Sequence, residues 1–201
     1  MFGDPVENPK GWEVKKLGDL SDSVRYGTSQ PPVFSETGYK FIRATNIKKG
    51  AIVEQDMQFI DEVEASKLQK CKLQGGELLI VRSGANTGDT CVITSSYIGQ
   101  YAGYDIIVNL KDQIVESIFV NSLLNTNYMD VVIKPLTKRA AQPHLNSDQI
   151  KNLCIFLPPL SLQHSFAAKI ESIEHQKQLL RASIKETEML FQSRMDYWFN
   201  G

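Results

Sequence analysis

The C-terminal part of the chain carries apolar side chains at alternating spacings of four and three residues. The positions of this seam are, in order, Phe166, Ile170, Ile173, Lys177, Leu180, Ile184, Thr187, Phe191, Arg194 and Trp198. The polar residues Lys177, Thr187 and Arg194 interrupt it. A heptad pattern of this kind is typical of a helix that packs lengthwise against another helix. A second apolar stripe widens the same face and consists of Leu179, Leu190 and Met195. The pattern therefore predicts one long, coiled-coil-type helix.

The double proline Pro158–Pro159 separates this helix from the residues before it. Two prolines cannot lie inside a helix, and each pushes its preceding residue out of the α region. After them the chain has no proline, and no glycine before Gly201. We therefore expect a domain at 1–160 and a spacer and dimerisation helix at 161–201, with Ser161 as its N-cap.

The length of this helix favours pairing with a helix of another chain. About 36 residues rising about 1.5 Å each would make a rod about 54 Å long. The polar seam positions would weaken a helix pair but fix its register and its partner. A helix folded back on its own domain is the alternative. The residues expected to pair are Ile170, Ile173, Leu180, Ile184, Phe191 and Trp198.

Before the double proline, short apolar runs alternate with turn residues, which is typical of a compact α+β domain with a mixed sheet. The strands predicted there cover 13–18, 39–43, 77–82, 90–93 and 104–110. The predicted helices cover 62–71 and 115–132, and the predicted loops 26–32 and 135–146. The glycine-rich segment 83–89 suits a hairpin connection between two of these strands.

Composition and charge narrow the classes of function. The chain has 201 residues, 42% of them hydrophobic, which is enough for one sizeable core. Its formal net charge of −1 gives no global basic excess, so a nucleic-acid surface would have to be a local patch or share phosphate binding with partner subunits. No apolar run could span a bilayer and the start is not a secretory signal. We therefore expect no membrane association and a cytoplasmic protein.

The residue pattern offers no convincing catalytic or metal site. The three cysteines are far apart, so we expect buried or partly buried thiols in a reducing compartment. The segment 83–88 lacks the lysine of a phosphate-binding loop. His164 and His175 would lie about 16 Å apart on the helix, too far for one metal ion. The tetrapeptide of an adenine methyltransferase active site is absent. We therefore expect a non-catalytic protein with no cofactor and no metal.

Three segments carry basic, hydroxyl or amide side chains that suit phosphates and base edges: 26–30, 82–87 and 138–144. A plain structural hairpin and a solvated basic loop are the alternatives for the second and third segments. The candidate DNA contacts are Arg25, Tyr26, Thr28, Ser29, Arg43, Arg82, Ser83, Asn86, Thr87, Lys138, Arg139, Gln142 and His144.

In order and spacing, three longer stretches resemble the specificity subunit of type I restriction–modification systems. Gly11–Leu20 resembles the family's entry strand, and Gly75–Ala85 its strand and Arg-Ser-Gly-Ala loop. Ala141–Asn146, followed by Ile155–Leu160, resembles the passage into the family's spacer helix. The resemblance implies a subunit that reads one half of a bipartite target in double-stranded DNA. It also implies partners, namely methyltransferase subunits and, through them, the restriction subunit.

Members of this family usually hold two recognition domains and two helices, whereas this chain holds one of each. Its two ends resemble the junction between such halves, so we expect a natural half-subunit or an excised half of a longer protein. Either form predicts a head-to-tail or antiparallel homodimer. The alternative function is a protein-interaction module with a dimerising helix that never touches DNA, which the near-neutral net charge favours. An enzyme with an unrecognised site is a further alternative.

Overall fold

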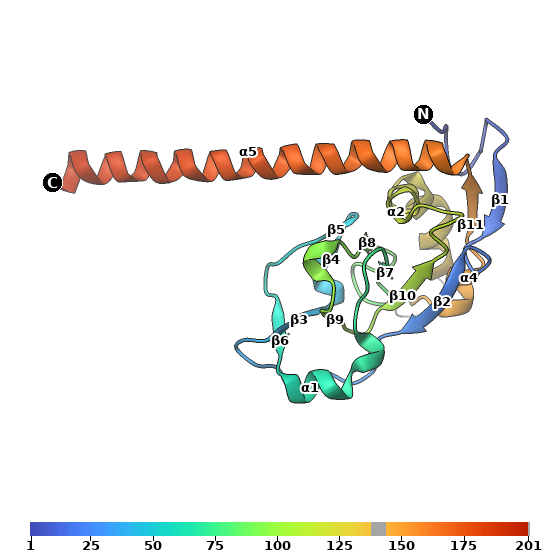
Figure 1. Ribbon diagram of the computed structural model, residues 1–201, viewed down its shortest axis with the longest axis horizontal. Coiled ribbons are helices and arrows are strands. Elements are labelled where there is room, and N and C mark those ends of the chain that lie inside the picture. The colour runs from blue at the N-terminus through green and yellow to red at the C-terminus, as the bar shows by residue number, and fades with distance from the viewer. Residues whose placement is uncertain (138–143, 201) are drawn as a thin grey trace. The chain divides into compact units, whose positions relative to one another are not determined.

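The computed structural model describes residues 1–137 and 144–200. By its internal contacts the chain divides into two compact units, Met1–Gln163 and the residues from His164 onward. The first unit contains all of the strands described, and the second is a single helix (Figure 1). This combination confirms the α+β fold class and the long C-terminal helix.

The strands of the first unit form one central sheet and three smaller ones. The central sheet has the order β2 (Ser21–Tyr26), β10 (Ile106–Leu110), β7 (Leu78–Ile80), β8 (Thr90–Val92). A second sheet has the order β6 (Gln58–Ile60), β3 (Tyr39–Ile42), β9 (Tyr101–Ala102). Two short pairs complete the set: β1 (Glu13–Lys16) with β11 (Cys154–Leu157), and β4 (Ile47–Lys48) with β5 (Ala51–Ile52). The sheets are mixed, because β3 is parallel to β9 and antiparallel to β6.

The helices of the first unit are short. They are α1 (Glu62–Lys67), α2 (Ser117–Leu124), α3 (Lys134–Thr137) and α4 (Ser147–Lys151). Three turns of 3-10 helix, η1 (Ala44–Asn46), η2 (Gln69–Cys71) and η3 (Ser95–Tyr97), and one π-helical segment, η4 (Met129–Ile133), lie among them. The last element, α5, runs without interruption over Leu160–Asn200 (Figure 1).

The core lies against the central sheet. One apolar cluster includes Leu79 and Val81 from the β7 region and Ile107 from β10, all fully buried. β7 and the middle of β10 are apolar on both faces, so their sequences are continuous apolar runs in which apolar and polar residues do not alternate. This burial explains why the segments around 77–82 and 104–110 are recognisable as strands in the sequence.

Several predicted elements differ from the observed ones. The predicted helix over 115–132 is broken, because Asn125 and Thr126 hydrogen-bond back to Asn121 and Leu123 and end α2. The predicted loop at 26–32 begins inside a strand, since Tyr26 is the last residue of β2. α5 begins one residue before the expected cap, with the Pro159 carbonyl accepting the first helical bonds.

The thiols also differ in part from expectation. Cys71 and Cys91 are buried, whereas Cys154 is exposed, and all three are free. Cys154 begins β11, and its side chain is exposed although the next two residues of the strand, Ile155 and Phe156, are buried.

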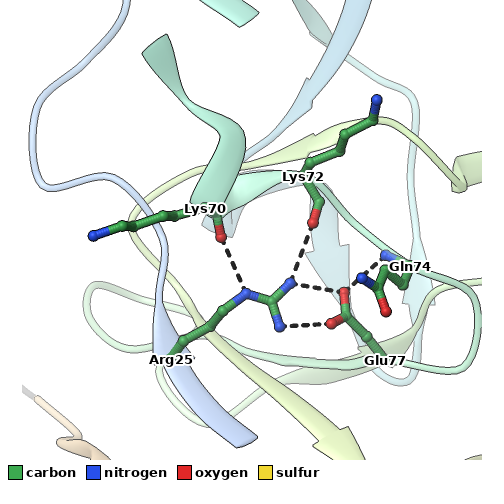
Figure 2. A network of polar contacts seen from close by, with 5 residues as sticks. All are labelled: Arg25, Lys70, Lys72, Gln74 and Glu77. Atoms are coloured by element: carbon green, nitrogen blue, oxygen red, sulfur yellow. Dashed lines mark hydrogen bonds and ion pairs between the residues drawn. The ribbon is translucent and has the colours of Figure 1, made fainter. Parts of the chain in front are cut away.

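An ion pair between a partly exposed arginine and a buried carboxylate joins β2 to the segment that leads into β7 (Figure 2). Arg25 donates from Nη1 and Nη2 to the two carboxylate oxygens of Glu77 at 2.6 Å and 3.0 Å. Its Nε and Nη2 also donate to the carbonyls of Lys70 and Lys72. The Glu77 carboxylate is 1% exposed and accepts a further bond from the Gln74 backbone N–H. Four of the five guanidinium N–H groups can thus be assigned to structural bonds.

Replacing Arg25 with Ala should lower the free energy of unfolding by about 3–5 kcal/mol, because a buried carboxylate would lose its counter-charge. Urea unfolding of purified protein measures the change. Lys70→Ala removes one positive charge from the same region but leaves the Lys70 carbonyl in place, so it is the matched control. Equal stabilities of the two variants would contradict a structural role for Arg25.

Candidate nucleic-acid interface

The pairing around β10 brings three chain segments to one end of the central sheet. β10 is antiparallel to both β2 and β7, and Ile106 is the register partner of both Tyr26 and Ile80. The end of β2, the end of β7 and the start of β10 therefore lie together. Side chains at these three positions can share one site although they are far apart in the sequence.

At this end of the sheet, Arg82 contacts two aromatic rings and a histidine. Its guanidinium carbon lies 4.5 Å from the ring centroid of Tyr26 and 4.6 Å from that of Tyr104. Its Nε and Nη2 atoms lie 3.3 Å and 3.1 Å from Nε2 of His144. We call these four residues the Arg82 cluster. Both tyrosines are exposed, at 40% and 43%, so the cluster is at the protein surface.

Backbone bonds hold the members of the Arg82 cluster in place. The Leu145 N–H donates to the Arg82 carbonyl at 2.8 Å, and Ser83 forms a β-bridge with His144. The Ser147 N–H donates to the Tyr26 hydroxyl at 2.8 Å. The pKa of Tyr26 is lowered, mainly by interaction with the Ser147 side chain and to a smaller extent by this backbone bond and the charge of Arg82. The predicted segments 26–30, 82–87 and 138–144 thus meet through their described residues.

Gly27 allows the backbone next to Tyr26 to approach the backbone next to Tyr104. Gly27 follows Tyr26, and Gly103 precedes Tyr104. A Cβ added at Gly27 would lie 1.7 Å from the Gly103 carbonyl oxygen, which no side chain can tolerate. The Gly27 N–H also donates to the Asp105 carbonyl at 2.9 Å. The missing side chain at Gly27 is therefore a condition for this part of the site.

A buried carboxyl lies directly beneath the Arg82 backbone. The Arg82 N–H lies 3.4 Å from Oδ1 of Asp105, and the Asp105 residue is 1% exposed. Its Oδ2 atom is buried and has no hydrogen-bond partner among the described residues. Burial raises the pKa of Asp105 to about 7, and the bond from the Arg82 N–H opposes this only in part. Asp105 is therefore a costly group to ionise.

The glycine-rich loop is tightly folded. Gly84 and Gly88 both have a positive φ, and the Thr87 hydroxyl donates to the Gly84 carbonyl. The Asn86 side-chain amide donates to the carbonyls of Ala44 and Ile47, so it holds the loop against the segment after β3. Ser83, Gly84 and Ala85 keep some exposure. Asn86 thus makes structural contacts, and any role in DNA binding stays a prediction.

The other candidate DNA contacts lie in different surroundings. Arg43 donates to the Asp56 carbonyl and lies 6.0 Å from the ring of Phe34. The Thr28 hydroxyl is bonded within its own turn, and Ser29 is exposed. Arg25 is engaged with Glu77 as described above. Three further candidates lie outside the described residues, namely Lys138, Arg139 and Gln142.

Tyr104 is the member of the Arg82 cluster that the sequence interpretation missed. It begins the predicted strand 104–110 but is exposed, unlike the apolar residues that follow it. The Tyr26–Gly27 and Gly103–Tyr104 pairs mirror one another, which is the signal that could have drawn attention to it.

The helix α5 presents its apolar seam without cover over much of its length. Leu180 and Ile184 are 63% and 58% exposed, and Trp198 is 73% exposed. Ile173 and Phe191 are also exposed, whereas Ile170 is partly buried. Exposed apolar side chains at heptad spacing are the usual mark of a helix that has a partner. The predicted pairing residues therefore stay candidates for such a contact.

Neither a metal cluster nor a membrane helix is found in the described part of the chain. No three His, Cys, Asp or Glu side chains among residues 1–137 and 144–200 are grouped to hold an ion. Over the same residues, none of the helices combines the length and the hydropathy that crossing a membrane requires.

Asp105→Asn should make the free energy of unfolding less dependent on pH. With a folded-state pKa of about 7 against an ordinary 3.8, the folded protein holds a proton that the unfolded chain has released between these values. The contribution of Asp105 to wild-type stability should therefore fall as the pH rises from about 4 to about 7, by about 4 kcal/mol at most, and then level off.

The measurement is urea unfolding of wild type and Asp105→Asn at pH 5 and pH 8. The variant should gain stability relative to wild type at the higher pH. Asp112→Asn, at an exposed position, controls for loss of an acidic side chain. The same pH dependence in wild type and Asp105→Asn would show that Asp105 does not carry the effect.

Comparison with known proteins places the chain in a family. The family profile described as "Type I restriction modification DNA specificity domain" matches residues 9–189. The chain is 27% identical over 183 residues to the type I restriction enzyme MjaIX specificity subunit of Methanocaldococcus jannaschii, covering 87% of this chain and 41% of that protein. It is 26% identical over 175 residues to the EcoKI specificity subunit of Escherichia coli K12, covering 82% and 37%. It thus spans less than half the length of these relatives.

Solved structures share the fold. An HsdS subunit from Thermoanaerobacter tengcongensis matches with a TM-score of 0.59 and 19% identity, over 94% of this chain and 50% of that one. A type I restriction–modification S subunit from M. genitalium matches with a TM-score of 0.57 and 11% identity, over 87% and 44%. Because the profile match extends over most of its length, the chain belongs to the family of type I restriction–modification DNA specificity domains.

Proposed function

We propose that this chain reads one half of a bipartite DNA target as a recognition domain of a type I restriction–modification specificity subunit. The observation that carries the proposal is the convergence of Tyr26, Arg82, Tyr104 and His144 at one exposed end of the central sheet. Among the described residues, no acidic side chain is paired with the Arg82 guanidinium. A cation held at an exposed site suits an anionic, hydrogen-bonding partner such as DNA.

The near-neutral net charge is compatible with this role. Phosphate contacts set the position of a protein on DNA, whereas base-edge hydrogen bonds set the sequence. A net charge of −1 leaves little general attraction to phosphates. Partner subunits would then supply part of the phosphate binding, and the Arg82 cluster would supply contacts within the target. We propose methyltransferase subunits as these partners, with the restriction subunit recruited through them.

The proposal places the chemistry in the partners. Methylation of adenine with S-adenosylmethionine, and cleavage or translocation with ATP, would belong to the other subunits. The role of this chain is then to bind and orient, with no cofactor of its own.

Reconstitution with the cognate methyltransferase subunit, followed by mapping of methylated adenines genome-wide, tests the function. We expect methylation at one split motif, with two specific parts separated by unspecified bases. The chain without the methyltransferase should methylate nothing, and the methyltransferase without the chain should give no such motif. Methylation that is independent of the chain would remove the proposed function.

We further propose that α5 pairs with a second copy of α5. The helix has 41 residues, so at about 1.5 Å per residue it is about 60 Å long, comparable with about 18 base pairs. That length is an upper limit on the distance between two half-sites, and it does not predict the number of base pairs between them. Two copies related by a two-fold axis would carry identical recognition domains, so their target would be a split palindrome.

Charged substitutions on the seam test this pairing. The double variant Leu180→Asp with Ile184→Asp should raise the dimer dissociation constant by about two orders of magnitude or more, because two carboxylates would enter an apolar contact. The matched control is Gln178→Asp with Ala182→Asp, with the same spacing on the opposite helix face. Analytical ultracentrifugation measures both. A loss of the dimer in both double variants, or in neither, would argue against the seam as the contact.

A protein-interaction module that never contacts DNA is the second candidate. The near-neutral net charge and the exposed apolar seam favour it. Binding of the chain–methyltransferase complex to duplex DNA should fall steeply with salt if DNA is the ligand. The interaction module would instead leave DNA binding to the methyltransferase alone and unchanged by this chain.

A further inference from the structure

The guanidinium of Arg82 keeps N–H donors that form no hydrogen bond to a described residue. A guanidinium is planar and has five N–H donors in its plane. The rings of Tyr26 and Tyr104 contact it through their π faces and use none of these donors. Nε and Nη2 lie against Nε2 of His144. Nη1, together with the second hydrogen of Nη2, therefore remains as a pair of parallel donors.

Arg25 shows what a structural arginine looks like in the same sheet. Its guanidinium donates to both oxygens of the buried Glu77 carboxylate and to two carbonyls (Figure 2). Its charge is neutralised and four of its five N–H groups are used. Arg82 has aromatic neighbours where Arg25 has a carboxylate. The nearby Asp105 carboxyl is bonded to the Arg82 backbone N–H, at 3.4 Å, through Oδ1.

The surroundings of Arg82 fix its orientation before any ligand binds. Tyr26 is held through its hydroxyl by the Ser147 N–H, and His144 is held by its β-bridge to Ser83. Gly27 keeps the backbone next to Tyr26 close to Gly103, the neighbour of Tyr104. An arginine fixed in this way loses little side-chain conformational entropy on binding. It binds only ligands whose acceptor atoms match the positions of its two parallel N–H donors.

We propose that Arg82 is a specificity-determining residue that recognises a guanine, with Tyr26, Tyr104 and His144 as positioning residues. The inference rests on the proposed function and names the chemistry of the same site. Guanine presents two adjacent acceptors, O6 and N7, in the major groove, which fit two parallel N–H donors. Adenine presents an acceptor beside a donor there, and would leave one Arg82 donor unpaired.

A DNA phosphate also offers two acceptor oxygens to such a fork. Phosphate binding needs charge and reach more than orientation, and exposed lysines supply both. Three contacting side chains that hold one guanidinium in a fixed plane suit a contact that must discriminate between bases. We therefore assign the Arg82 edge to guanine, and a phosphate contact is an outcome that the test can return.

The test compares the methylated motifs of reconstituted complexes that carry wild type, Arg82→Lys or Arg82→Ala. Each complex is also used to select from a library of duplexes with random sequence. The wild type should require one G·C pair in its motif. Both variants should lose that preference, about 10-fold or more, while the other positions stay unchanged. Lysine keeps the charge but lacks the fork, so Arg82→Lys separates geometry from charge.

Two further arms test the positioning residues and the atom that is read. Tyr104→Phe keeps the aromatic face and should keep the motif, whereas Tyr104→Leu should relax the same G·C position. Replacing that guanine with 7-deazaguanine removes N7, and should weaken binding of wild type about 10-fold but leave Arg82→Ala unaffected. Lys70→Ala controls for loss of one positive charge in the same domain. Thermal melting of each variant identifies any that fail to fold, and Arg82→Lys and Tyr104→Leu then carry the test.

Four outcomes would overturn the assignment. A phosphate contact would give a different result for Arg82→Ala. Affinity would fall equally for all sequences, the motif would stay unchanged, and the slope of log affinity against log salt concentration would become smaller by about one. An unchanged affinity and motif would remove Arg82 from the interface. If wild type itself yields no motif, the proposed function fails first, and the assignment of Arg82 fails with it. A motif that survives every variant at its G·C position overturns the inference alone.

Discussion

The antiparallel register around β10 is the constraint on which the candidate site depends. Because Ile106 is paired with Tyr26 on one side and with Ile80 on the other, the ends of β2 and β7 must meet at the start of β10. A shift of one residue in either pairing would turn Tyr26 or the residues after Ile80 to the opposite face. The Arg25–Glu77 pair joins β2 to the segment before β7, so it favours the same register. Separating the two side chains would leave the Glu77 carboxylate buried without its counter-charge, which disfavours other arrangements.

Electrostatics within the first unit follow from burial and not from total charge. The charge of Arg25 is balanced by a carboxylate that is 1% exposed. The neighbours of the Arg82 guanidinium are aromatic, so its charge is not balanced in this way. Asp105, beneath Arg82, has its pKa raised to about 7 by burial, which reduces the negative charge it would place under the cluster. A protein with a net charge of −1 can therefore keep a local cation at its surface.

Much of the fold could be predicted because burial leaves a pattern in the sequence. The hairpin of β7 and β8 and the helix α5 were recognisable, since apolar runs and heptads depend on local spacing. β2 was missed because its residues, Ser21–Tyr26, are mostly polar, and one of its charges, Arg25, bonds to a partner 52 residues away. The helix predicted over 115–132 failed because side chains of Asn125 and Thr126 compete for the backbone.

The candidate site was predictable in part for a related reason. The Arg82 loop was visible as a basic residue before glycines, but its partners come from three other segments of the chain. Tyr104 could not be connected to Arg82 without the β10 register, and Arg25 and Asn86 could not be recognised as structural without their buried partners. Which of two arginines can meet a ligand is a property of long-range contacts, and residue type alone does not carry it.

The exposed seam of α5 raises a separate physical question, which is why a helix of 41 residues should keep such a stripe. The side chains of Leu180, Ile184 and Trp198 are each more than half exposed, so they gain little from burial within the chain. Their removal from water on pairing would supply the driving force for association, at about 25 cal/mol per Å² of apolar surface. Polar seam residues such as Lys177 reduce that gain but restrict the register. A pair with a restricted register holds its two ends at a fixed separation, which is the property that a reader of two separated half-sites requires.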